Sequence, residues 1–494
     1  MPAQVTTRAQ VNGYRFLLRR LEHAVIRADS RMIHDPMRGQ MRALLVGVVV
    51  AVLISGAAGV LAFMKPSPNF GQSSIMLNKS NGELMVRIGD RLHPALNLAS
   101  ARLIAGKSDP PNEVDGKFLN TIALGPTVGI VGAPSGIYAG DGSTIPSWTV
   151  CDSAPVAPAT AQDGGSAELT TVIAGDPDLD TSIQTAAPEQ AVLATAGGAT
   201  YLLYDGVRAA IDPASPVLAS ALRLRGSEAR HVSPGLLQAF PEVDPIVPVV
   251  IPEAGTPTDY LPAGYRIGSI LHSSDSRGEQ LYVTLPDGLQ PISPSTADII
   301  RYGNPQVPSA AAPMPVSLAM ISRAPIVHTL PVDSYPSRSP VLVSAGSDAV
   351  LCMSWRRTDD GTRDGTRVLL GSRLPLPGAA EPVDLATADG GGPGVDGVYL
   401  KPGTGTFVQS AGAGSSDRPT GQLFYVSDLG IRYHIADPAA AAALGLGPTR
   451  AQPAPWSVLS LLPPGPELSR QAAMIAHDGM PADDRGLPVV PPKS

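Results

Sequence analysis

The longest uninterrupted apolar stretch of the chain covers residues 43–64, where no side chain is ionisable and only Ser55 carries a polar group. About 22 residues at ~1.5 Å per residue form a helix of ~33 Å, which is long enough to cross the hydrocarbon core of a bilayer. A cleaved signal peptide would have a shorter apolar run nearer the N-terminus, and a buried core helix would show a polar face. The pattern therefore predicts one retained transmembrane helix.

Before this stretch, residues 11–27 carry apolar side chains at helical spacing, which predicts an amphipathic helix. Its apolar face consists of Tyr14, Leu17, Leu18, Leu21 and Val25. Arginines lie on the other side of the same helix. A basic amphipathic helix either lies on an anionic membrane surface or docks its apolar face on a partner subunit. The sequence leaves both interpretations open.

Charge is distributed unevenly about the predicted span. Residues 1–42 carry eight arginines against three acidic residues, a net charge of +5, whereas the rest of the chain carries 28 basic and 40 acidic residues. The positive-inside rule then places the N-terminus in the cytoplasm and the bulk of the chain on the other side of the membrane. The acidic balance of that outer part argues against nucleic acid as a partner.

One pattern recurs four times after the span, beginning near residues 82, 199, 280 and 422. An apolar run is followed by Asp-Gly or an equivalent turn and by a second short strand, which predicts a β-hairpin. In three copies a residue that caps helices then precedes a proline, at Asp212, Ser293 and Asp437. Each copy is therefore expected to be a hairpin followed by a short helix.

The copies are unevenly spaced, which leaves two further segments of short apolar runs, residues 125–195 and 330–415. They hold the two cysteines, Cys151 and Cys352, and a tryptophan lies near each, at Trp148 and Trp355. We read these runs as paired core strands of one central domain. The 51 glycines and 51 prolines favour short elements over long helices.

The predicted fold class is mixed α+β, mainly β: one N-terminal transmembrane helix and an elongated, pseudo-twofold ectodomain of four hairpin–helix repeats around a central β domain. The predicted segments are a cytoplasmic arm (1–42), the transmembrane helix (43–64), repeat 1 (65–124), the first half of the central domain (125–195), repeat 2 (196–275), repeat 3 (276–329), the second half of the central domain (330–415), repeat 4 with a terminal helix (416–480) and a mobile tail (481–494).

Cys151 and Cys352 both follow the span, on the side where thiols are commonly oxidised, so we expect one disulfide between them. Closing a loop of ~200 residues contributes roughly 5 kcal/mol in the chain-entropy model. The alternative is a pair of separate buried thiols. A metal site is not expected, because further ligands are missing near the cysteines and the eight histidines show no ligand spacing.

Residues 101–108 match a loose phosphate-loop pattern that ends in Gly106, Lys107 and Ser108. A working loop follows a strand and opens a helix, so that backbone N–H groups and the helix N-terminus bind phosphate. Here the segment ends an expected helix, and Pro110 and Pro111 forbid another helix directly after it. A helix C-cap at Gly106 is the favoured interpretation, with nucleotide binding as the alternative. No catalytic residue and no cofactor are assigned.

Taken together, the arm at residues 13–24, the single span, the four repeats, the two cysteines and the Pro-Trp…Pro-Pro-Gly-Pro segment at residues 455–466 resemble the EccB family of type VII (ESX) secretion systems. The resemblance covers essentially the whole chain.

This resemblance implies a structural subunit of an inner-membrane secretion complex, with the N-terminus cytoplasmic and the bulk of the chain periplasmic. The implied partners are the EccC motor ATPase, EccD, EccE, a mycosin protease and further copies of the chain. The repeats are similar to a cell-wall-binding fold of phage endolysins, which makes peptidoglycan contact a weaker alternative. Family members are often labelled ATPases, so nucleotide hydrolysis is the alternative function.

Overall fold

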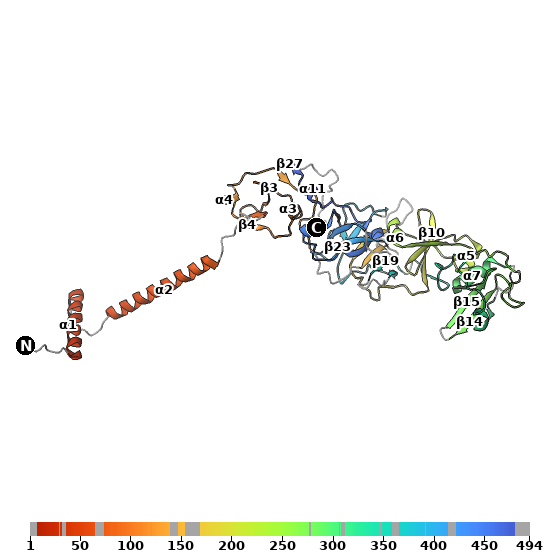
Figure 1. Ribbon diagram of the computed structural model, residues 1–494, viewed down its shortest axis with the longest axis horizontal. Coiled ribbons are helices and arrows are strands. Elements are labelled where there is room, and N and C mark those ends of the chain that lie inside the picture. The colour runs from red at the N-terminus through yellow and green to blue at the C-terminus, as the bar shows by residue number, and fades with distance from the viewer. Residues whose placement is uncertain are drawn as a thin grey trace, which may run out of the picture. The chain divides into compact units, whose positions relative to one another are not determined.

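The computed structural model describes residues 7–28, 30–31, 36–64, 74–119, 121–138, 147–153, 168–275, 278–305, 307, 312–344, 348–357, 365–390, 392–412 and 421–479 (Figure 1). The chain divides into two compact units, Met1–Ser73 and Ser74–Ser494. It is mixed α and β, mainly strands, with one long apolar helix near the N-terminus. The predicted tail at residues 481–494 lies outside the described residues.

The first unit contains helices α1 (Arg8–Arg27) and α2 (Pro36–Met64). The backbone N–H of Thr7 donates to Oε1 of Gln10 at 2.9 Å and so fixes the first turn of α1. Residues Gly39–Leu61 of α2 are long and apolar enough to cross a membrane, and none of this stretch is buried. The predicted span at residues 43–64 lies within α2.

Four sheets of the second unit begin in the same way: the first strand is antiparallel to the second, the second is antiparallel to the third, and the fourth pairs in parallel with the first. Their strands are β1 (Ile75–Asn78), β2 (Leu84–Ile88), β3 (Arg91–Pro94) and β4 (Asn112–Val114); β9 (Gln190–Ala196), β10 (Ala199–Tyr204), β11 (Val207–Ile211) and β12 (Arg230–His231); β14 (Ile270–Asp275), β15 (Gly278–Thr284), β16 (Leu289–Ile292) and β17 (Met314–Pro315); and β23 (Gly405–Ala411), β24 (Leu423–Ser427), β25 (Arg432–Ile435) and β26 (Gln452–Pro455).

Two further strands extend the sheet of β9 to β12, and a separate two-stranded sheet is also present. Strands β13 (Glu242–Ile246) and β18 (Val341–Leu342) pair in parallel with β11 and β9, and β5 (Thr127–Val128) pairs with β27 (Ala476–His477).

Helices follow the strands in a regular order. The third strand of each sheet leads into α3 (Leu98–Ala105), α5 (Pro216–Ala221), α7 (Pro294–Gly303) or α9 (Pro438–Leu444). The fourth strand leads into α4 (Gly116–Leu119), α6 (Pro234–Ala239), α8 (Leu318–Ile321) or α10 (Trp456–Leu459), and α11 (Arg470–Ala473) follows the last sheet.

The caps of these helices match the sequence in two cases and differ in one. The side chains of Ser293 and Asp437 accept hydrogen bonds from backbone N–H groups in the first turns of α7 and α9. Asp212 does not cap α5: its carboxylate accepts from the N–H of Ala214, and the helix begins later, after Ser215. The prediction of Asp212 as the cap was therefore wrong, because a tight Asx turn comes first and Ser215 precedes the proline at the helix start.

A seven-stranded sheet combines strands from two distant parts of the chain. Its order is β21 (Val383–Asp384), β22 (Gly397–Tyr399), β7 (Leu169–Ala174), β6 (Trp148–Ser153), β19 (Val350–Arg356), β20 (Gly365–Gly371) and β8 (Ile183–Thr185). Strands β6 and β19 are antiparallel neighbours with Cys151 opposite Cys352 and Trp148 opposite Trp355, which is the pairing that the sequence suggested.

Two strands belong to other sheets than the predicted segment boundaries imply. All of β9 except Ala196 lies within residues 125–195, and β23 lies within residues 330–415, yet these strands pair with β10 and β24 and not with the seven-stranded sheet. Each is the first strand of a three-stranded meander, so a boundary drawn at the hairpin cuts it from its own sheet. The hydrophobic core of the first and last of the four sheets is shared through α3 and α9, and that of the middle two through α5 and α7.

Candidate functional site

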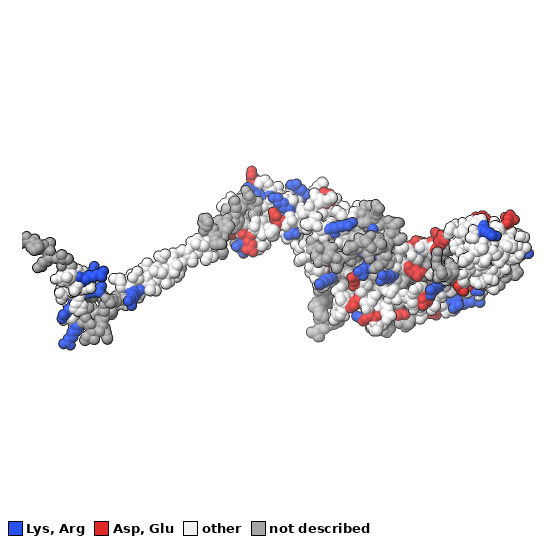
Figure 2. Space-filling model, turned by 60° about the horizontal axis from the view of Figure 1, so that its bottom comes forward, with Lys and Arg blue, Asp and Glu red and all other residues white. Residues whose placement is uncertain are grey.

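The arm helix α1 exposes its apolar face. The exposed fractions are 65% for Tyr14, 56% for Leu17, 45% for Leu18, 62% for Leu21 and 82% for Val25. Basic side chains gather on the same helix, whereas α2 is free of charge along residues 43–64 (Figure 2). A row of exposed large apolar residues on a charged helix is typical of a surface that binds a partner or a membrane.

The disulfide Cys151–Cys352 lies at the centre of the seven-stranded sheet, and both cysteines have an exposed fraction of 0%. The bond joins residues 201 positions apart. Trp148 and Trp355 form a pair three positions from the disulfide, toward one end of the two strands, and are also buried. The bond therefore links β6 and β19 inside a packed core, where it holds the two distant segments together.

Residues 101–108 form the last turn of α3 and the loop after it. Gly106 has a φ of 67° and its N–H donates to the carbonyl of Arg102 at 2.8 Å, which is the geometry of a left-handed C-cap. Lys107 donates its backbone N–H to the same carbonyl. Ser108 faces α9, since a Cβ added at Gly445 would lie 3.3 Å from its Cβ atom. The negative end of the helix dipole thus points toward Gly106, Lys107 and Ser108.

A buried polar cluster lies beside the disulfide, and sequence reasoning missed it. Oδ2 of Asp152 accepts from the N–H of Ser233 at 2.7 Å, and Oδ1 accepts from the hydroxyls of Ser233 and Thr170 at 2.8 and 3.0 Å. Glu168 and Arg230 complete the cluster. Asp152, Glu168 and Arg230 have exposed fractions of 0%, 7% and 8%.

Burial changes the proton affinity of these groups. It raises the pKa of Asp152, against the lowering effect of the bonds from Ser233 and Thr170 and of the nearby Arg230. Burial, and then the negative charge of Asp152, raise the pKa of Glu168 to about 7. Burial also lowers the pKa of Arg230. The cluster therefore contains two carboxyl groups and one guanidinium that depend on one another for charge balance.

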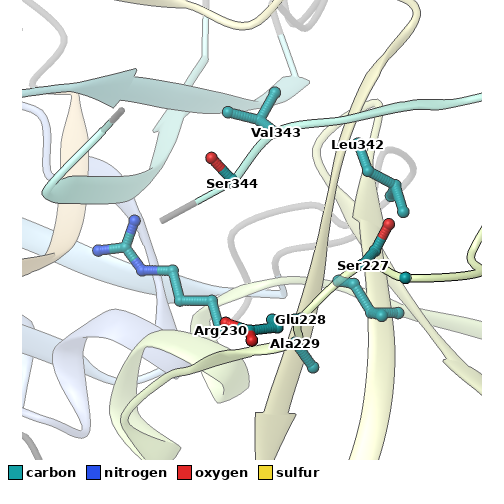
Figure 3. A pocket seen from close by; sticks show the side chains of 9 residues that line it. Ser227, Glu228, Ala229, Arg230, Leu342, Val343 and Ser344 are labelled. Carbon is teal, nitrogen blue, oxygen red and sulfur yellow. The ribbon is translucent and has the colours of Figure 1, made fainter. Parts of the chain in front are cut away.

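A cavity of about 390 Å³ opens against Arg230 (Figure 3). Its walls are Leu193 of β9, residues 226–230 and residues 342–344. A second, more open hollow of about 610 Å³ lies near the end of β11 and beside β13. Among the described residues, no group of three or more His, Cys, Asp or Glu side chains is arranged to hold a metal ion.

The comparison with known proteins settles the family. The family model for type VII secretion system ESX-1, transport TM domain B (EccB), matches residues 3–482. The chain belongs to the EccB family. Among its curated relatives, the ESX-3 secretion system ATPase EccB3 of Mycobacterium tuberculosis is 39% identical over 97% of this chain and 91% of the relative. The ESX-1 secretion system ATPase EccB1 of the same species is 35% identical over 98% of this chain and 97% of that relative.

Chains in solved structures of ESX complexes resemble this one along most of its length. A chain of the intact ESX-5 inner membrane complex superposes with a TM-score of 0.70 and 33% identity, and the match covers 99% of both chains. The EccB3 dimer of the ESX-3 core complex gives a TM-score of 0.68 and 34% identity over 82% of this chain and 100% of that one. A chain of the ESX-5 periplasmic assembly covers 85% of this chain, with a TM-score of 0.65.

Proposed function

We propose that this EccB-family chain is a structural subunit of an inner-membrane type VII secretion complex. The observation that carries this function is the full-length structural match to a chain of the ESX-5 inner membrane complex, from the arm helix to the last sheet. The fold agrees with such a role, because a buried disulfide links the two distant segments of the seven-stranded sheet and the arm exposes an apolar face.

The proposed topology is a single pass through the inner membrane. Helix α2 is the span, the arm lies in the cytoplasm, and the second unit lies in the periplasm. The surplus of arginine before α2 and the surplus of acid after it support this orientation. The similarity of 85% of the chain to a chain of an ESX-5 periplasmic assembly supports the location of the second unit.

The four sheets that begin with the same strand order are proposed to be four copies of one unit, placed on either side of the seven-stranded sheet. The common strand order and the two helices after the third and fourth strands support this proposal. Each copy would then contain four strands and two helices, which is more than the hairpin and one helix that the sequence pattern suggests.

The proposed partners are the EccC motor ATPase, EccD, EccE and a mycosin protease, together with further copies of this chain through the second unit. The EccB3 dimer supports self-association. The arm is proposed to dock on cytoplasmic partners through Leu17, Leu21 and the residues beside them, since this face is exposed and apolar. Peptidoglycan is retained as a weaker candidate partner of the four units.

Hydrolysis of nucleotide is the second candidate function, because relatives carry the name ATPase. The geometry of residues 101–108 favours the structural role: phosphate binds at the positive N-terminal end of a helix, whereas Gly106 lies at the C-terminal end of α3. Lys107→Ala is therefore expected to leave secretion and assembly unchanged. Lys117→Ala is the matched control, since it removes the same charge from another exposed position.

The test is purification of the tagged full-length chain from its native membrane in mild detergent, with identification of the co-purifying proteins. Recovery in a large complex with a motor ATPase and other membrane subunits is expected, and deletion of residues 1–42 should break that complex. Recovery of the chain alone, with nucleotide hydrolysis that Lys107→Ala abolishes, would overturn the proposal in favour of an enzyme.

A further inference from the structure

Three ionisable side chains meet where the seven-stranded sheet contacts the sheet of β9 to β13. Asp152 lies on β6, Glu168 precedes β7 by one residue, and Arg230 is the first residue of β12. Each is at least nine-tenths buried. A buried charge is costly unless an opposite charge or hydrogen bonds compensate it, so the number of protons in this cluster affects how tightly the two sheets are joined.

The hydrogen bonds assign the proton to one carboxyl group. Asp152 accepts three hydrogen bonds, from the backbone N–H and hydroxyl of Ser233 and from the hydroxyl of Thr170, which suit a carboxylate. Glu168 lacks such donors: its Oε2 atom is buried and makes no hydrogen bond, and its side-chain hydrogen bond is with Asp152, which raises the pKa of Glu168. Asp152 therefore holds the negative charge of the cluster and Glu168 the proton.

Arg230 binds the backbone directly before β19, and its charge is part of the balance in the cluster. Its Nη1 donates to the carbonyl of Asp348 at 2.7 Å and its Nη2 to the carbonyl of Ala349 at 2.8 Å. These carbonyls come directly before β19. One guanidinium balances one carboxylate, so the cluster is neutral only while Glu168 keeps its proton.

The cavity in Figure 3 lies beside this connection. Strand β9 pairs with β18 at residues 190–191 and with β12 at residues 194–195, on the side away from β10. Leu193, between these two pairings, lines the cavity. The β-ladder is thus interrupted beside Arg230, so the cavity borders the residue of the cluster that binds the backbone before β19.

We infer that Asp152, Glu168 and Arg230 form a proton-operated latch between β12 and the segment before β19: protonated Glu168 keeps it closed, and ionised Glu168 loosens it along the cavity. The second negative charge would be buried beside Asp152 with only one guanidinium to balance both. Since burial and Asp152 raise the pKa of Glu168 to about 7, the latch changes state near neutral pH.

The other charged groups near the latch are Asp348, Asp396 and Glu228. Asp348 acts on Arg230 as a further negative charge. Asp396 accepts from the N–H groups of Thr170 and Gly390, both at 2.8 Å, and Glu228 lies on the wall of the cavity. The charges that act on Glu168 itself are those of Asp152 and Arg230.

The test is hydrogen–deuterium exchange of the full-length chain in detergent between pH 5.5 and 8.5, corrected for the intrinsic pH dependence of exchange. We expect the peptides that cover residues 226–232 and 348–352 to lose protection with a midpoint near pH 7. With a pKa of about 7 in the closed state and 4.5 in the open state, the opening equilibrium can change by at most about 30-fold between pH 5.5 and 8.5. Glu168→Gln should remove this step and keep the peptides protected.

Glu113→Gln is the matched control, because it removes a carboxylate whose side chain is 65% exposed and pairs with Lys79. It should leave the step unchanged. Asp152→Asn removes the negative charge that helps to raise the pKa of Glu168, so the midpoint should move to lower pH. The latch is refuted if wild-type protection stays level across this pH range, or if the step persists in Glu168→Gln.

Discussion

The turn between β10 and β11 offers a sharp test of how the hairpin contacts the seven-stranded sheet. Asp205 and Gly206 both have positive φ values, 45° and 75°, as a two-residue turn of the type that suits twisted hairpins requires. A Cβ atom added at Gly206 would lie 2.0 Å from the carbonyl oxygen of Thr366, which belongs to β20. Glycine is thus needed both for the turn and for the contact with β20.

Gly206→Ala is expected to lower the stability of the chain by about 2–5 kcal/mol. The left-handed backbone costs an alanine about 1–2 kcal/mol, and overpacking adds about 1–3 kcal/mol. The overlap involves the backbone of Thr366, so a side-chain rotation cannot relieve it. Gly197→Ala is the matched control: Gly197 lies in the neighbouring turn with a φ of 56°, and a Cβ there meets nothing within 4 Å. Only the backbone term of about 1–2 kcal/mol applies to it.

The assay is thermal unfolding of both full-length variants in detergent, followed by the fluorescence of the buried Trp148 and Trp355. Gly206→Ala should unfold at a clearly lower temperature than Gly197→Ala. Equal losses in the two variants would contradict the contact between the hairpin and β20, because the strain of the turn alone would then account for both.

Three further outcomes follow from the core and the disulfide. Replacing Cys151 and Cys352 with alanine should cost roughly 5 kcal/mol, from the 201-residue separation, and should make urea unfolding insensitive to reductant. Because the pKa of Glu168 is raised, its protonation contributes about 3 kcal/mol of stability below pH ~4.5, and this contribution is lost as the pH rises to about 7. The melting temperature of the wild type should therefore be lower at pH 8 than at pH 5, whereas that of Glu168→Gln should be the same at both. Leu103→Ala, in the core shared by α3 and α9, should cost about 2–5 kcal/mol in the same scans, whereas Lys107→Ala should cost almost nothing.

Local sequence signals predicted the elements that depend on neighbouring residues. The long apolar helix, the arm helix and the caps at Ser293 and Asp437 each follow from a few adjacent positions. The same signal failed at Asp212, where two residues that cap helices compete within four positions. Asp287–Gly288 also differs from the other turns: Gly288 does not have a positive φ, and glycine is needed there because a Cβ would lie 2.5 Å from the carbonyl oxygen of Pro325.

The parallel strands that complete the four sheets could not be predicted from the sequence. The fourth strands contain only two to four residues, as in β12 (Arg230–His231) and β17 (Met314–Pro315). A period of two residues cannot be recognised in so short a segment. Their place is decided by the first strand of each sheet, whose free edge they cover.

The disulfide and the polar cluster differ in what the sequence reveals, although they are neighbours in the fold. Two cysteines allow a single pairing, and an oxidising compartment makes that pairing the expected one. Asp152, Glu168 and Arg230, by contrast, are three of 43 acidic and 36 basic residues, and nothing in their local sequence marks them as buried. Their burial is a property of the junction between two sheets, which appears only when β6, β7 and β12 are brought together. The same disulfide-linked strand β6 carries Asp152, so the covalent link and the proton-sensitive contact act on one element: the first fixes its pairing with β19, and the second adjusts its contact with β12.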